Sequence, residues 1–326
     1  MTSPLLTPCI QPNPDIAGIG VRVAIYAQAF LSFFLFVVFS VDGQITPKED
    51  RVIREIIENN ELMACALLVS ALVQAWTYGL SVYHANIVLV LSWITFVPAL
   101  AIADYSDLQT EPHRDQPVRF GTTWRAILRE FFVWIHCLTV AGLGIWVWSD
   151  VRSFGDQREC TPQTFVVIFG HNVLVTNQKL KVFALLLYGF IALGATEWLV
   201  YVPLEWYKRR HTPQESPSGV DLGLLRAFFA TIGSKLSWAS FIFTISIEIL
   251  LVASTEVLVR RSRGFVLPGE SQWTFGQSLA VMLVISPLVR TIEDTHKGIR
   301  ELHTSWKSRR RIVGEENTPV SAPPSP

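Results

Sequence analysis

Charged residues are scarce in this sequence. Only 17% of its 326 residues are Asp, Glu, Lys or Arg, half are hydrophobic, and the mean hydropathy is +0.35. Soluble proteins carry a charged fraction nearer a quarter of the chain. Because 27 basic residues are balanced by 27 acidic ones, the chain lacks the basic excess that nucleic-acid binding requires. The composition therefore predicts a membrane protein and excludes a nucleic-acid partner.

Cysteine and the signatures of soluble enzymes are also scarce or missing. Four cysteines in a chain of this length do not make a secreted disulfide scaffold. The sequence has no GxSxG, no phosphate-binding loop, no HExxH, no CxxC and no Asn-x-Ser/Thr acceptor. We therefore expect neither an enzymatic activity nor a cofactor or metal.

The apolar residues that are present lie in long blocks. A helix that crosses the hydrocarbon core of a bilayer needs about 20 mostly apolar residues. Seven windows meet this requirement: 19–41, 62–80, 84–103, 127–148, 182–202, 236–259 and 273–288. The fold class that we predict is all-α, a polytopic bundle of seven transmembrane helices within residues 19–290. The apolar segment 164–176 is short and interrupted by Gly170, so we interpret it as a loop, hairpin or surface segment, with an eighth span as the alternative.

The distribution of Lys and Arg predicts the orientation of the chain. With seven spans, 19 of the 27 Lys and Arg residues fall on the side of the carboxyl terminus and eight on the other side. The positive-inside rule then places the carboxyl terminus in the cytoplasm, with residues 1–18 as an extracytoplasmic arm. We expect the protein in the plasma membrane or another endomembrane of the secretory system.

Two segments beside the spans have helical patterns. Thr46-Pro47-Lys48-Glu49 has the spacing of a capping box with Pro at the first helical position. We predict a helix that begins there and continues through the second span for more than 30 residues. Residues 291–312 predict an amphipathic helix on anionic inner-leaflet lipid, with a plain stop-transfer flank as the alternative. Residues 313–326 have the composition of a disordered tail.

Ionisable residues inside the spans form the candidate site, because a charge at that depth is costly and usually faces protein or water. Glu248 lies in the middle of the sixth span, with Glu256 eight residues later. Glu197 lies in the fifth span, His136 lies in the fourth, and Gln28 adds an amide to the first. One interpretation is a proton- or cation-binding cavity. The other is structural, with protonated Glu248 making one interhelical hydrogen bond or pairing with an arginine.

Two pairings are predicted on the extracytoplasmic side. Cys9 and Cys160 both fall on that oxidising side, where a disulfide between them would pin the arm to the loop after the fourth span. Two unrelated free thiols are the alternative. Arg22 lies about one helical turn inside the first span and needs an acid partner such as Asp15 or Glu256. We take Arg22–Asp15 as the candidate structural ion pair.

Two stretches carry a resemblance to known sequences. Residues 13–22 (NPDIAGIGVR), with Cys9 just upstream, resemble a signature of uncharacterised fungal multi-pass membrane proteins. Residues 80–85 (LSVYHA), followed by IVLVLSW, are similar to the same group. The resemblance covers about the first 95 residues and beyond them only the layout of the spans. It implies origin and topology, and it implies no activity.

Three classes of function stay open. The acids inside the spans favour a channel or transporter, which is compatible with a homo-oligomer. Seven spans with an outer amino terminus favour a receptor or sensor, although the seventh span has no lysine for retinal and residues 103–105 (ADY) lack the acid–arginine pair of the large receptor family. The basic carboxyl-terminal segment favours a membrane scaffold. The lipid bilayer is the partner common to all three.

Overall fold

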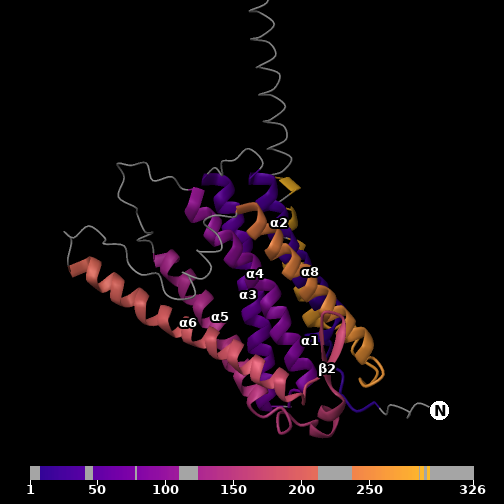
Figure 1. Cartoon of the computed structure of the whole chain (residues 1–326). Coiled ribbons are helices and arrows are strands. Elements are labelled where there is room, and N and C mark those ends of the chain that lie inside the picture. Colours follow the sequence, from indigo (N-terminus) through magenta and orange to yellow (C-terminus); the bar gives the residue numbers. More distant parts are fainter. Residues whose placement is uncertain are drawn as a thin grey trace, which may run out of the picture. The chain divides into compact units, whose positions relative to one another are not determined.

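Long helices make up most of the chain. The structure is a computed structural model that describes residues 8–40, 47–77, 79–109, 124–211, 237–285, 287–289 and 292–293. A four-residue helix, α1 (Pro14–Ala17), precedes the long ones. The long helices are α2 (Ile19–Ser40), α3 (Pro47–Thr77), α4 (Val82–Gln109), α5 (Trp124–Ser149), α6 (Gln178–His211) and α8 (Ser237–Ser262). The predicted helical character is confirmed, and the segments up to Val284 form one compact unit (Figure 1).

Several of these helices have the properties of membrane spans. Five in the described part of the chain are long and apolar enough to cross a membrane: Pro14–Val38, Val52–Thr77, Phe131–Ser149, Gln178–Glu197 and Phe241–Ser262. Two shorter apolar helices, Val82–Pro98 and Phe275–Val289, coincide with the third and seventh predicted spans. These helices are compatible with an integral membrane protein, and the count of seven spans stays a prediction. The predicted amphipathic helix 291–312 lies outside the described residues except for 292–293, and the predicted tail lies wholly outside them.

Helix α3 follows its sequence signals closely. It begins at Pro47 and has 31 residues, as predicted for a helix that continues into the second span. It ends at Thr77, three residues before the predicted end of that span. The reason is local: Gly79 has a φ of +78°, a left-handed conformation that ends a helix. Ser81 then caps α4, because its Oγ accepts the backbone N–H of His84 at 3.3 Å.

Residues 164–176 form a hairpin and not an eighth span. Strands β1 (Phe165–Ile168) and β2 (His171–Leu174) pair antiparallel, with Phe165 opposite Leu174 and Ile168 opposite His171. Gly170, with a φ of +81°, lies in the turn. Strand β1 also contacts α8. We call the end of the bundle that carries these strands the hairpin end.

The amino-terminal arm is tied down at the hairpin end. Ile10 forms a parallel bridge with Val266, and the Leu267 N–H donates to the Ile10 carbonyl at 2.8 Å. Cys9 forms a disulfide with Cys160, with 5.9 Å between their Cα atoms. Cys160 belongs to a short 3₁₀ helix, residues 158–163. The arm therefore joins the segment after α8 to the segment after α5, and the cysteine pair is the one that the sequence offered for a disulfide.

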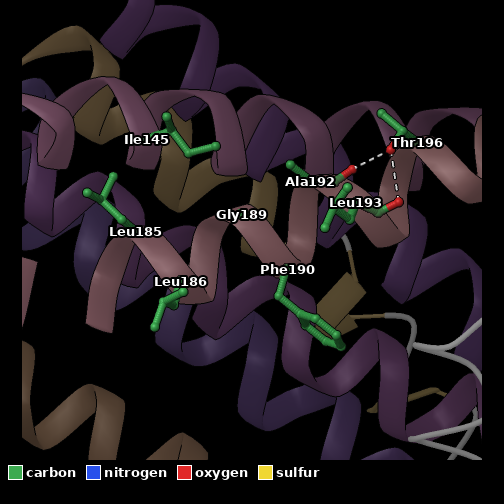
Figure 2. A pocket seen from close by; sticks show the side chains of 8 residues that line it. All are labelled: Ile145, Leu185, Leu186, Gly189, Phe190, Ala192, Leu193 and Thr196. Atoms are coloured by element: carbon green, nitrogen blue, oxygen red, sulfur yellow. Dashed lines mark hydrogen bonds between the residues drawn. The ribbon is translucent and has the colours of Figure 1, made fainter. Parts of the chain in front are cut away.

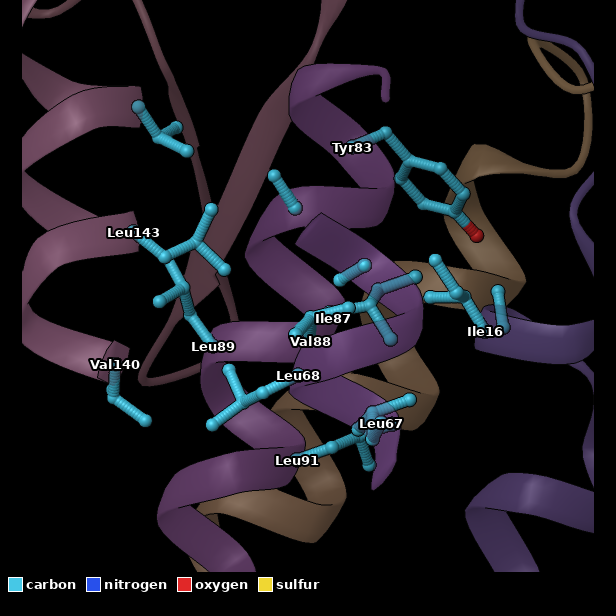
Figure 3. Close-up of a cluster of buried hydrophobic side chains, with 14 of the residues drawn as sticks. Ile16, Leu67, Leu68, Tyr83, Ile87, Val88, Leu89, Leu91, Val140 and Leu143 are labelled. Carbon is cyan, nitrogen blue, oxygen red and sulfur yellow. The ribbon is translucent and has the colours of Figure 1, made fainter. Parts of the chain in front are cut away.

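The apolar core is divided into two clusters along the bundle. The larger lies toward the hairpin end and centres on α4, where Ile87, Val88, Leu89 and Leu91 are buried (Figure 3). Figure 3 shows these α4 side chains together with Leu143 of α5. The smaller cluster joins α2, α3 and α8 toward the opposite end. Its buried members are Leu31, Phe33, Leu35, Phe36, Ile53, Ile56 and Phe241. On α3 the two apolar clusters are separated by the buried polar side chains of Asn60 and Glu61, and on α2 Gln28 lies beside the boundary between them.

Candidate functional site

Buried polar side chains from five helices lie among the members of the two apolar clusters. We call this set the polar layer, and each member is more than nine-tenths buried. Its members are Gln28 and Ser32 of α2, Asn60 and Glu61 of α3, Ser92 of α4, His136 of α5 and Glu248 of α8. Polar groups removed from water normally find partners, because an unpaired one costs free energy. The partners of each member therefore decide whether the layer is a structural link or a site.

Helices α2 and α3 are linked through Asn60. Its Nδ2 donates to the Ser32 Oγ at 2.9 Å and to the Gln28 carbonyl at 3.5 Å. The Ser32 hydroxyl in turn donates to the Gln28 carbonyl at 3.0 Å. The side-chain amide of Gln28 and the Oδ1 of Asn60 have no hydrogen-bond partner among the described residues. This part of the layer is half satisfied, so it retains capacity to bind.

Helices α3 and α5 meet through a carboxyl group and an imidazole. The Glu61 Oε2 lies 3.3 Å from the His136 Nδ1, and the Cys65 Sγ approaches the same nitrogen at 3.9 Å. The imidazole stacks on the Phe96 ring, with 6.1 Å between centroids and 15° between planes. Neither carboxyl oxygen of Glu61 has a hydrogen-bond partner in the described part of the chain, and neither does the His136 Nε2. The pair is close, oriented by packing and incompletely bonded.

Glu248 lies at the same level of the bundle. Helices α2 and α8 touch at two heights, where Arg22 pairs with Glu256 and where the Phe33 and Phe241 rings approach to 5.7 Å. Glu248 is eight residues from Glu256 and seven from Phe241, about 12 and 10 Å along α8. On α2, eight residues after Arg22 is position 30, and seven residues before Phe33 is position 26. The level of Glu248 on α2 therefore falls between positions 26 and 30. Glu248 is therefore level with the α2 members of the polar layer.

The carboxyl group of Glu248 is fully enclosed and unpaired. Its exposed fraction is 0%, and neither oxygen has a hydrogen-bond partner among the described residues. The Arg22 guanidinium is occupied elsewhere, at the hairpin end. Neither Glu248 nor Glu61 has a strong cation partner among the described residues, so it is costly to hold their carboxyl groups ionised inside the bundle. The structural interpretation of Glu248 requires one interhelical hydrogen bond or an arginine partner. Neither is present in the described structure.

The four predicted intramembrane residues therefore do not form a single site. His136 and Glu248 belong to the polar layer, whereas the Glu197 side chain is exposed on α6 and does not join them. Glu256 lies at the hairpin end with its side chain 48% exposed. Glu61 was missed because the predicted second span began one residue after it. Glu61 lies four residues before the half-buried Cys65, so both side chains are on the packed face of α3. This spacing is the sequence signal that places Glu61 in the polar layer.

The predicted Arg22–Asp15 pair is wrong, and the partner of Arg22 is Glu256. The buried guanidinium pairs with the Glu256 carboxylate, which also accepts the Tyr26 hydroxyl at 3.0 Å. The Arg22 Nε donates to the Ala17 carbonyl at 2.9 Å. Asp15 instead accepts the Thr274 hydroxyl at 2.6 Å. Because α1 is a separate turn before α2, Asp15 is directed toward the segment after α8 and away from Arg22.

A second polar cluster lies at the hairpin end. The Ser81 Oγ is 2.7 Å from the His84 Nδ1, and the His84 Nε2 is 3.0 Å from the Glu270 Oε1. The Tyr83 hydroxyl donates to the other Glu270 oxygen at 3.3 Å. The order serine, histidine, carboxylate is that of a hydrolase triad. Ser81 is 5% exposed and its Oγ already serves as the cap of α4, so we interpret this cluster as a structural link between α4 and the segment after α8.

An apolar groove of about 820 Å³ lies along α6 (Figure 2). Its lining residues are Ile145, Leu185, Leu186, Gly189, Phe190, Ala192, Leu193 and Thr196. The single hydroxyl, of Thr196, donates to the Ala192 and Leu193 carbonyls of its own helix, as the dashed lines in Figure 2 show. The groove therefore offers no polar group to a ligand, and the polar layer is the better candidate site.

Comparisons with known proteins return nothing on which to base a function: no protein-family model, no curated protein and no solved structure matches the chain. Within the described segments, no group of three or more His, Cys, Asp or Glu residues is placed to hold a metal ion. The case for a function therefore rests on the chemistry of the polar layer.

Proposed function

We propose that this protein is a multi-pass membrane channel or transporter that moves a cation by way of the polar layer. The observation that carries the proposal is the burial of Glu61 and Glu248 at one level of the bundle, with four carboxyl oxygens that lack hydrogen-bond partners in the described structure. Acids inside membrane bundles commonly mark ion and proton pathways. A cation at this level would supply the missing positive charge.

The proposed topology has seven spans with the hairpin end outside and the carboxyl terminus in the cytoplasm. The Cys9–Cys160 disulfide supports this orientation, because disulfides persist in oxidising compartments and the bond lies at the hairpin end. The two shorter apolar helices supply the third and seventh spans. The fungal membrane-protein group that residues 13–22 resemble is a compatible origin for this layout.

Charge movement in a reconstituted membrane tests the proposal. Purified protein is placed in liposomes, and currents are recorded on a solid-supported membrane under separate gradients of H⁺, Na⁺ and K⁺. We expect a current with one of these cations that is lost in Glu61→Gln and reduced in Glu248→Gln. A wild-type protein that carries no current with any of them contradicts the proposal.

Glu197→Gln is the matched control for these variants. A Cβ on Gly144 of α5 would lie 2.5 Å from the Tyr188 ring of α6, so those two residues are level. His136 lies eight residues before Gly144 on α5. Because α5 and α6 run antiparallel, the position level with it on α6 lies eight residues after Tyr188, at Thr196, beside Glu197. The control thus removes an exposed carboxylate at the depth of the polar layer, and its current should equal that of the wild type.

A further inference from the structure

We propose that the cation is a proton and that it is bound between Glu61 and His136. This inference rests on the proposed function, since it names the ion that the polar layer carries. The geometry that supports it is a separation of 3.3 Å between the Glu61 Oε2 and the His136 Nδ1 inside a buried site. Small motions of either helix bring these atoms to hydrogen-bond distance, where one proton serves both groups.

The site lacks the free backbone carbonyls that commonly hold an alkali cation in transporters. Coupling ions such as Na⁺ in transporters are held by unwound backbone carbonyls and helix ends. Here α3 and α5 continue as helices through Glu61 and His136, so their carbonyls are engaged in helical hydrogen bonds. A proton needs no ligand shell and requires only one acid and one base.

The balance of charge is simple. With the proton bound, the pair consists of a neutral carboxyl group and a neutral imidazole. Release of the proton leaves a carboxylate beside the neutral imidazole, and the net charge of the pair falls by one. Uptake from the other side of the membrane restores the first state, so each cycle transfers one proton and no other bond forms or breaks.

Among the described residues, few other titratable groups face the pair. On the same two helices, the Cys65 and Cys137 thiols are its titratable neighbours. At this level the described side chains of α2 and α4 are all uncharged, among them Gln28, Ser32 and Ser92. Helix α8 contributes Glu248, which is the second carboxyl group of the layer, and α6 contributes the exposed Glu197. Glu248 is the other buried carboxyl group at this level that lacks a hydrogen-bond partner among the described residues.

Infrared difference spectroscopy tests proton binding independently of transport. Reconstituted protein is titrated with pH, and the stretching band of the protonated carboxyl group is followed in H₂O and D₂O. We expect a pH-dependent carboxyl band that is lost in Glu61→Gln, retained in Glu197→Gln and shifted in frequency in His136→Gln. A band that is unchanged by Glu61→Gln overturns the inference. Should Glu61→Gln fail to fold, as judged by size-exclusion chromatography, the His136→Gln spectrum decides, since an unshifted band also overturns it.

Proton flux in the same liposomes completes the test, with an internal pH dye and a K⁺ diffusion potential as the driving force. Wild-type flux that is lost in Glu61→Gln supports the inference. A Na⁺ or K⁺ current without proton flux overturns it and leaves the proposed function standing. Titration of the Glu61 band without movement of any ion supports the proton site and overturns the proposed function.

Discussion

Arg22 of α2 and Glu256 of α8 are joined by an ion pair whose two halves differ in burial. The Arg22 side chain is 7% exposed, whereas the Glu256 side chain is 48% exposed. Removal of one partner therefore has unequal consequences, because a buried charge left alone is more costly than an exposed one. The pair is positioned to hold the first and the sixth predicted spans together at the hairpin end.

Glu256→Gln should destabilise the protein more than Arg22→Met does. The first change leaves a buried guanidinium without its counter-charge, at a cost of about 1–3 kcal/mol. The second leaves a carboxylate that water can reach and retains the apolar stem. Thermal unfolding in detergent, followed by tryptophan fluorescence, measures both, and the double variant should be more stable than Glu256→Gln alone. Equal losses from the two single variants would contradict this account.

Loss of the disulfide should lower stability by about 2–4 kcal/mol, the usual contribution of a native bridge. The relevant variant is Cys9→Ser, and Cys65→Ser is its control because Cys65 is a free thiol in the structure. A reducing agent should lower the unfolding midpoint of the wild type and leave that of Cys9→Ser unchanged. Alkylation followed by mass spectrometry reports the thiol count, and a Cys160 that is alkylated without reduction would show that the bond does not form.

Gly144 should not tolerate even alanine. A Cβ at this position would lie 2.5 Å from atoms of the Tyr188 ring, where α5 and α6 pack. Overpacking of this kind typically costs about 1–3 kcal/mol. Gly142 is the matched control on the same helix, since a Cβ there meets nothing within 4 Å and alanine is the better helix former. We expect a lower unfolding midpoint for Gly144→Ala, no loss for Gly142→Ala, and partial recovery in Gly144→Ala/Tyr188→Ala.

Glu248→Leu should make the protein more stable and less active. The carboxyl group is enclosed without a hydrogen-bond partner in the described structure, so an apolar side chain of similar size removes a penalty of about 1–3 kcal/mol. Thermal unfolding and the ion current, measured on the same preparation, test the two halves of the prediction. Decreased stability would instead favour a structural role for Glu248.

Local signals in the sequence predicted the helices well. The start of α3 at Pro47 follows from a proline that is favourable at the first helical position and an acid that suits the first turn. The interruption of residues 164–176 at Gly170 likewise predicted a break, which is now the turn of the hairpin. Both features depend on the conformational preferences of a few adjacent residues, and those preferences can be read without knowledge of the fold.

The partners of charged residues were harder to predict because they depend on how the helices pack. Asp15 is closer than Glu256 to Arg22 in sequence, yet α1 and α2 direct the two side chains apart. Glu61 precedes the predicted second span by one residue, and only the packing of α5 against α3 shows it beside His136. Composition and periodicity locate a buried face, but they do not identify which helix covers it.

The attachment of the arm constrains the order in which the protein assembles. Cys9 leaves the ribosome 151 residues before its bonding partner, Cys160. The strand partner of Ile10, Val266, is made later still, after α8. The arm must therefore wait, unattached, while most of the bundle is inserted. The arm is made before its partners and reaches its final place only after them.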